Sequence, residues 1–240
     1  MVVGLCGMVI TTYYAFGLLH LLTLDLFHKP ASLYKTKIQP KRPFDASTLP
    51  SLFFNLLINQ LLVLVPFSWL VWKLQCEGSG GGNEATACLG GPELPSLLIV
   101  ARDMLCFILI EEVLFFYSHL LLHRGVLYDK IHRKHHEYKS PIALAAAYCH
   151  PVEMLLANVI PINVGPFLMR SHFLTTALWY FAAILGTQMH HCGFKLPWIL
   201  GNQPQFHDLH HETFTNNYGL LGVLDYLHGT YTVKKQTKEH

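Results

Sequence analysis

Long apolar runs alternate with polar stretches along this chain of 240 residues. Five runs are long enough to cross or enter a lipid bilayer, at residues 1–27, 49–72, 96–122, 142–169 and 171–189. Apolar residues make up 52% of the chain and charged residues only 13%, well below the roughly 25% of charged residues in soluble domains. The pattern predicts an all-α fold, a polytopic membrane helical bundle.

The first and the last two runs have distinct features. Residues 1–27 are apolar up to Asp25, and His20 is the only other residue among them of the Asp, Glu, Lys, Arg and His types. They lack a basic start and a small-residue cleavage site, so we interpret them as a membrane helix and not as a removed signal peptide. Three prolines and a glycine interrupt residues 142–169, which together with 171–189 predict a hairpin that enters the membrane and returns.

The loops between the runs differ in charge. Residues 28–48 carry five Lys or Arg, whereas residues 74–95 carry six glycines, three glutamates and no Lys or Arg. Because Lys and Arg accumulate on the cytosolic side of a membrane, the first loop is predicted to be cytosolic and the second to lie on the far side. If that side is the lumen of the endoplasmic reticulum, Cys76 and Cys88 could pair there; the alternative is two unpaired thiols.

Histidine is the unusual residue, with sixteen copies. Eight of them form three clusters with helical spacing: His119 and His123; His132, His135 and His136; His207, His210 and His211. Spacings of three and four bring side chains to one face of a helix, so each cluster is predicted to present two or three imidazoles to one point. Eight imidazoles exceed the needs of one ion, so we expect two metals in a histidine-rich helical cap on the cytosolic face.

The ligand type limits the metal. No cysteine stands at ligand spacing, which argues against a structural zinc site. A haem needs only one or two axial ligands, so eight clustered histidines argue against a haem site as well. Imidazole-rich sites suit zinc, copper, iron and nickel. Two irons at a membrane surface are suited to activating dioxygen and oxidising an unactivated C–H bond, with a membrane lipid as the substrate. The net charge of only +2 gives no indication of nucleic-acid binding.

Further residues are candidates for the same site. His191 and His150 are candidate additional ligands, with surface or supporting roles as the alternative. Asp208 and Asp225 are candidates for orienting the ligating imidazoles through their free N–H groups. The other isolated histidines are predicted to bind no metal.

The third apolar run also carries four charged residues: Arg102, Asp103, Glu111 and Glu112. Charged groups inside a span are costly and usually face a protein interior or a functional cavity. The alternative is an internal ion pair between Arg102 and a glutamate that only holds helices together.

The ordered set of three histidine clusters resembles the membrane fatty acid hydroxylase superfamily over about residues 96–230. That superfamily includes sterol C4-methyl oxidases, sterol C5-desaturases and sphingolipid hydroxylases. Several shorter segments are similar to the C4-methyl oxidase branch: residues 146–153, 191–194, 197–198, 217–219 and 225–230. The fatty-acyl 2-hydroxylases carry a histidine where this chain has Thr187, which counts against that branch. The chain is also short at both ends for the C4-methyl oxidase branch, as expected of a splice form or a fragment.

The resemblance implies a di-iron oxygenase of the endoplasmic reticulum membrane, with electrons from NAD(P)H delivered by a reductase and cytochrome b5. It implies that the eight cluster histidines are iron ligands and that His191 is a further one. We expect membrane helices and loops over residues 1–95, the catalytic domain over 96–230 and a polar tail over 231–240.

Three alternatives to a lipid hydroxylase follow from the sequence. A desaturase would use the same oxidising centre to remove two hydrogens without inserting oxygen. A non-catalytic lipid-binding protein of the same fold is a second alternative, and the complete set of eight histidines argues against it. A metal transporter would need polar ligands spread along its spans, whereas these clusters gather at one membrane edge.

Imidazole sites also bind zinc, so zinc is expected in some purified samples.

Overall fold

The computed structural model describes residues 2–76, 93–198 and 203–233, and in these ranges the regular elements are all helical, which confirms the all-α prediction. The α-helices are α1 (Val2–His20), α2 (Ala31–Tyr34), α3 (Leu49–Asn59), α4 (Val65–Cys76), α5 (Leu97–Leu122), α6 (Gly125–Lys130), α7 (Pro151–Glu153), α8 (Ile160–Met169), α9 (Phe173–His190), α10 (Gln203–Thr213) and α11 (Val223–His228). Cys88 lies outside the described residues, and with it the predicted pairing with Cys76.

Short segments of π or 3-10 helix join or extend several of these helices. The π segments are η1 (Leu21–Leu26), η3 (Gln60–Leu64) and η8 (Met154–Val159). The 3-10 segments are η2 (Ala46–Thr48), η6 (His132–Glu137) and η7 (Ala143–Ala147). As a result, α1 runs on through η1, and α3, η3 and α4 form one long helix.

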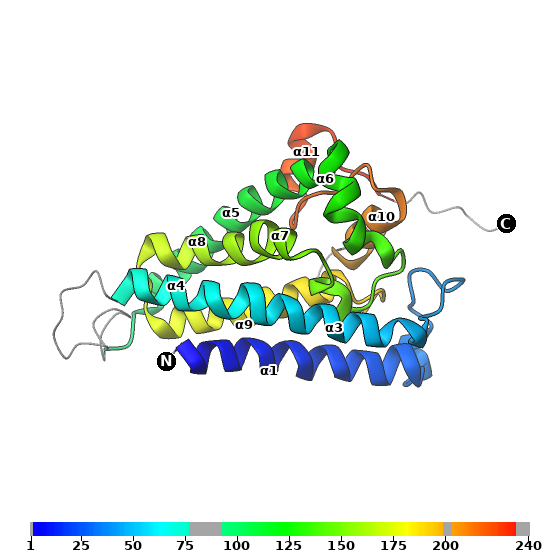
Figure 1. Cartoon of the computed structure of the whole chain (residues 1–240), viewed down its shortest axis with the longest axis horizontal. Helices are drawn as coiled ribbons and strands as arrows, with labels where there is room; N and C mark the ends of the chain where they lie inside the picture. Colours follow the sequence, from blue (N-terminus) through cyan, green and yellow to red (C-terminus); the bar gives the residue numbers. More distant parts are fainter. Residues whose placement is uncertain (1, 77–92, 199–202, 234–240) are drawn as a thin grey trace.

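The long helices lie side by side (Figure 1). The short helices α6, α10 and α11 lie together at one end of them, and we call this region the cap. Helices α1, α3–α4 and α9 run lengthwise, and α5 and α8 lie against them on one side. The 27–48 loop is at the same end as α6 and α10, whereas the turn between α8 and α9 is at the opposite end. Helices α8 and α9 therefore form the predicted hairpin, and all three histidine clusters reach one end of the bundle.

Close packing holds this arrangement together. A Cβ atom at Gly165 of α8 would lie 3.1 Å from Cα of Phe107, so the absence of a side chain there lets α8 approach α5. The hairpin is tied by Trp179, whose Nε1 donates to the Ile162 carbonyl oxygen at 2.9 Å, and by Tyr180, whose hydroxyl donates to Asn163 Oδ1 at 2.7 Å.

Three helical stretches are long and apolar enough to cross a membrane: Gly4–Leu26, Ala46–Gln75 and Pro151–Met169. Many of their large apolar side chains are exposed, including Phe54 and Leu62, as expected for a surface in contact with lipid. In the described part of the chain, α5 and α9 are not among these stretches, so fewer spans are found than the five apolar runs predicted. Helix α5 buries Asp103, Glu111 and Glu112, and in α9 polar residues interrupt the apolar run.

The 27–48 loop crosses the cap as a strap, a name we keep for these residues. Its backbone pairs with the segment after α9: the Ile38 N–H donates to the Gly193 carbonyl oxygen at 2.9 Å, and the Lys195 N–H donates to the Thr36 carbonyl oxygen at 3.0 Å. Lys37 lies 3.6 Å from Asp25, with both side chains buried. The strap thus connects the first membrane helix to the region that follows α9.

Candidate metal centre

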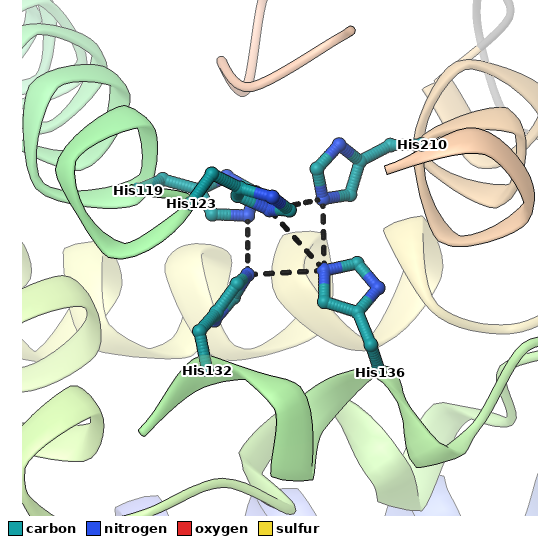
Figure 2. Close-up of side chains that lie close together, drawn as sticks. All are labelled: His119, His123, His132, His136 and His210. Atoms are coloured by element: carbon teal, nitrogen blue, oxygen red, sulfur yellow. Dashed lines mark hydrogen bonds between the residues drawn. The ribbon is translucent and has the colours of Figure 1, made fainter. Parts of the chain in front are cut away.

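Nine buried or half-buried histidines meet in the cap as two groups, and in each group the ligand atoms lie within 4.8 Å of one another. The first group is His119, His123, His132, His136 and His210, and Figure 2 shows their rings converging from three segments. The second group is His135, His191, His207 and His211. The eight cluster histidines and His191 are therefore brought together.

Each His-x-x-His-His cluster is divided between the two groups, which corrects the expectation that a cluster faces one point. His207 and His211 of α10 belong to the second group and His210 to the first. Likewise His135 belongs to the second group and His136 to the first. The cause is geometric, because adjacent side chains on a helix diverge by about 100° to 120°.

Backbone carbonyl groups fix the tautomer of four of these histidines. The Nδ1–H group of His119 donates to the Tyr218 carbonyl oxygen at 2.7 Å, and that of His210 donates to the Asn216 carbonyl oxygen at 2.6 Å. In the second group, His135 donates to Tyr148 at 3.1 Å and His191 to Thr187 at 2.8 Å. Since a carbonyl oxygen only accepts, the hydrogen lies on Nδ1 and each Nε2 presents a lone pair. All four Nε2 atoms are thus available as ligands.

In the second group the Nε2 atoms face one another at 2.9 to 3.1 Å, and two nitrogens that both carry a lone pair repel at this distance unless a cation lies between them. Nε2 of His191 lies 3.1 Å from Nε2 of His135, although both nitrogens carry lone pairs. His207 Nε2 lies 2.9 Å from His191 Nε2 and 3.1 Å from His211 Nε2. Burial lowers the pKa of His135 to about 4, so a proton does not serve as that cation at neutral pH. The donor set fits a metal ion.

In the first group the Nε2 atoms also face one another at close distances. Nε2 of His136 lies 3.0 Å from that of His132 and 3.2 Å from those of His123 and His210. Nε2 of His119 lies 3.1 Å from that of His132. Five nitrogens exceed the four ligands of a tetrahedral structural zinc site.

Glu153 is a residue of the site that the sequence analysis did not select. Its Oε1 lies 2.8 Å from Nδ1 of His132, and both side chains are buried. A carboxylate on the free nitrogen of a ligating imidazole orients the ring and raises its basicity. Glu153 follows His132 by 21 residues, in a different helix, and no local spacing connects them.

The two aspartates proposed for this orienting role have other contacts. Oδ1 of Asp208 accepts a hydrogen bond from Gln39 of the strap at 2.8 Å. Asp225 accepts the backbone N–H groups of Tyr218 and Gly219, each at 2.7 Å. Asp225 therefore acts on His119 through the backbone of Tyr218, whose carbonyl group holds the ring.

His150 belongs to neither group among the described residues. Its Nδ1 accepts the Val152 N–H at 3.2 Å and so caps the start of α7. The histidine before Pro151 thus has a local structural role, and its candidacy as a ligand has no support from the geometry.

Two cavities lie beside the histidines. The smaller, of about 30 Å³, is lined by members of both groups, including His119, His132 and His191. The larger, of about 160 Å³, is mainly apolar and lies between the lengthwise helices. Both cavities share four lining residues: Ala146, Asn158, Ile162 and Thr187. The two spaces therefore adjoin, and the larger one extends from the cap into the membrane helices.

Comparison with known proteins agrees with this arrangement. The family model named fatty acid hydroxylase matches residues 104–230, which include all nine histidines. The chain belongs to the fatty acid hydroxylase family. This confirms the resemblance stated from the histidine clusters.

Individual relatives extend the similarity toward the N-terminus. Fatty acid hydroxylase domain-containing protein 2 of Homo sapiens is 39% identical over 230 residues, covering 92% of this chain and 64% of the relative. A fatty acid hydroxylase of Mycosarcoma maydis is 32% identical, covering 90% of this chain and 54% of the relative. Methylsterol monooxygenase 2-2 of Arabidopsis thaliana is 37% identical, covering 61% of this chain and 60% of the relative. The chain thus spans 54% to 64% of their lengths. No solved structure matches the chain.

Proposed function

We propose that this protein is a membrane-bound non-haem di-iron oxygenase that oxidises a C–H bond of a lipid, with a C4-methyl group of a sterol as its target. The observation that carries the proposal is the pair of adjoining histidine groups, five and four imidazoles, whose Nε2 atoms face inward. When bound, the two irons supply the activation of dioxygen.

The protein side chains hold and orient this centre. The first group would bind one iron and the second group the other. Glu153 and four backbone carbonyl groups hold Nδ1 atoms and so point the rings. A metal held only by nitrogens is open to zinc as well, since imidazole suits both ions. Zinc in a purified sample would therefore replace iron at the same ligands.

The cavities support a lipid as the substrate. The larger one is lined by apolar residues of α1, α4, α8 and α9, such as Val9, Val71 and Ile184. It adjoins the small cavity at the histidines, so an apolar molecule in the membrane could reach the centre without passing through water. Excluding water from the centre also prevents side reactions of the oxidising species.

The sterol assignment is supported by the relatives and by one position in the wall. One relative is named a methylsterol monooxygenase, and another is named a fatty acid hydroxylase. Thr187, which lines both cavities, stands where fatty-acyl 2-hydroxylases carry a histidine. A fatty-acyl or sphingolipid hydroxylase or a lipid desaturase is the alternative, and a non-catalytic lipid-binding protein is a further one.

The proposal includes a location and an electron source. We propose that the histidines face the cytosol, because the basic 28–48 loop lies at the same end as the cap. The endoplasmic reticulum is the membrane that the family resemblance implies. Electrons would come from NAD(P)H through cytochrome b5 and its reductase. These are the cytosol-facing electron donors in the superfamily that the sequence resembles.

Lipid profiling of cells that lack this protein tests the proposal. A 4-methylated sterol should accumulate, and wild type should reverse this, whereas His135→Ala should not. A shift only in sphingolipids or fatty acyl chains would assign the protein to a sister branch. A product that has lost two hydrogens and gained no oxygen would identify a desaturase. No change in any lipid class would contradict an enzymatic function.

A further inference from the structure

The small cavity is the place where both histidine groups meet free space. Its wall contains histidines of the first group (His119 and His132) and of the second (His135, His191 and His207). Its volume of about 30 Å³ has room for about two water-sized molecules. Dioxygen and the reacting end of a substrate would be placed here under the proposed function.

One acidic side chain in this wall lacks a polar partner within the described part of the chain. Glu111 is 9% exposed and lines the cavity, and it has no hydrogen-bond or ion-pair partner among the residues that the structure describes. The neighbouring Glu112 is different, because its Oε2 accepts the N–H groups of Leu220 and Leu221, both at 2.9 Å. Glu153, the other carboxylate in the wall, is engaged with His132.

The position of Glu111 on α5 explains its direction. Glu111, Phe115 and His119 are spaced by four residues, and all three line the cavity. Spacings of four bring side chains to the same side of a helix, one turn apart. The Glu111 carboxyl group therefore lies two turns from a histidine of the first group, on the same side of α5.

The ion pair considered from the sequence does not involve Glu111. Arg102 instead binds the adjacent Asp103, with its Nε and one Nη each donating to Asp103 Oδ1 at 2.9 and 2.7 Å. A buried carboxyl group without a partner is costly, and such groups commonly mark functional sites.

The chemistry of the proposed function requires protons in this cavity. Hydroxylation consumes a C–H bond, dioxygen, two electrons and two protons, and yields an alcohol and one water. The electrons come from a one-electron protein donor, but the protons must reach a space enclosed by buried side chains. Desaturation consumes the same two electrons and two protons and yields two waters, so the requirement does not depend on which outcome occurs.

We propose that Glu111 is the proton donor of this cavity. The O–H bond of its carboxyl group breaks, and the proton passes to the oxygen atom that leaves as water. The resulting carboxylate then takes up a proton that water in the cavity relays from bulk solvent, which restores the acid, and a second such cycle delivers the second proton. This proposal rests on the proposed oxygenase function, and it assigns the protonation step to a residue of this chain.

The test compares Glu111→Gln, which keeps the shape without an acidic proton, with Glu111→Asp, which keeps the acid. Each full chain is placed in phospholipid nanodiscs with iron, cytochrome b5, its reductase, NADPH and a 4,4-dimethylsterol as the probe. Iron per chain, product, dioxygen consumed and hydrogen peroxide released are measured. Glu111→Gln should keep its iron, lose about 10²-fold or more in turnover and release peroxide, because general acid catalysis contributes about this much. Glu111→Asp should recover part of the turnover.

Wild-type coupling of product to dioxygen in Glu111→Gln would overturn the proposal. Loss of iron from Glu111→Gln would also overturn it, because the side chain would then support the metal centre. A wild-type protein that binds iron but oxidises no lipid would instead contradict the proposed function. The comparison therefore separates failure of the proton donor from failure of the oxygenase assignment.

Discussion

His135 and His136 are adjacent in the chain but belong to different histidine groups. The same division occurs at His210 and His211. Because the second and third clusters each contribute to both groups, the two groups cannot form independently of one another. The helical spacing predicted which eight histidines come together, but it could not predict the division, which depends on where α5, η6, α9 and α10 meet.

Single histidine substitutions should therefore affect the two groups unequally. His135→Ala removes one of the four nitrogens of the second group, and His210→Ala one of the five of the first. We expect each variant to lose mainly one iron, with a larger loss for His135→Ala because its group has fewer ligands. Iron per chain, measured by mass spectrometry with Mössbauer spectra of each variant, tests this expectation.

His150→Ala is the matched control, since His150 caps a short helix and belongs to neither histidine group among the described residues. It should keep both irons. Equal iron loss in His150→Ala and His135→Ala would show that the metal sites differ from the two groups described.

Under the proposed function, Glu153 acts on the metal through His132. Glu153→Gln keeps the size of the side chain but replaces the carboxyl group whose Oε1 lies 2.8 Å from Nδ1 of the ring. Loss of such a partner typically weakens metal affinity by about 10- to 100-fold. Iron retention during titration with a chelator should show this decrease. Glu93→Gln, at an exposed position remote in sequence, should retain iron as wild type does, and equal retention in both variants would refute the role of Glu153.

At the scale of elements, the strap supports the cap from outside the region matched by the family model. Nε2 of Gln39 donates to Asp208 Oδ1 and to the Lys139 carbonyl oxygen, both at 2.8 Å. Asp208 lies on α10 and Lys139 follows η6, so one buried amide joins the segments that carry two of the three clusters. Such a contact joins residues 100 or more positions apart, and no periodicity in the sequence could reveal it.

Gln39→Leu should therefore destabilise the cap. The substitution removes the hydrogen bonds from this amide to the buried Asp208 side chain and to the partly buried Lys139 carbonyl group, and one such bond typically contributes about 0.5–1.5 kcal/mol. We expect a lower Tm in detergent and faster loss of iron on heating. Thr36→Val is a suitable control in the same strap, because the Thr36 hydroxyl bonds only to the nearby Leu33 carbonyl oxygen at 2.7 Å. An equal Tm for Gln39→Leu and wild type would show that the strap does not support the cap.

At the scale of the whole molecule, charge and hydropathy predicted that the three clusters share one end of the bundle. Apolar runs and a basic loop are local properties of the sequence, so this part of the fold could be predicted. The number of spans could not, because α5 has the length of a span but buries charged residues against other helices. The cavities were also beyond prediction, since their walls combine residues from α1, α4, α8 and α9.

The passage between the two cavities gives the last prediction. Ile162 lines both cavities, so Ile162→Phe should narrow the connection between the membrane helices and the histidines. Turnover of a membrane lipid should fall, whereas iron content should be unchanged because Ile162 is not one of the nine histidines. Overpacking typically costs about 1–3 kcal/mol of stability, so Tm is measured alongside. Leu168→Phe, on the same helix but 65% exposed, controls for the added ring. Equal turnover in both variants would mean that the substrate reaches the centre by another route, and a fall only in Ile162→Phe would support entry from the membrane.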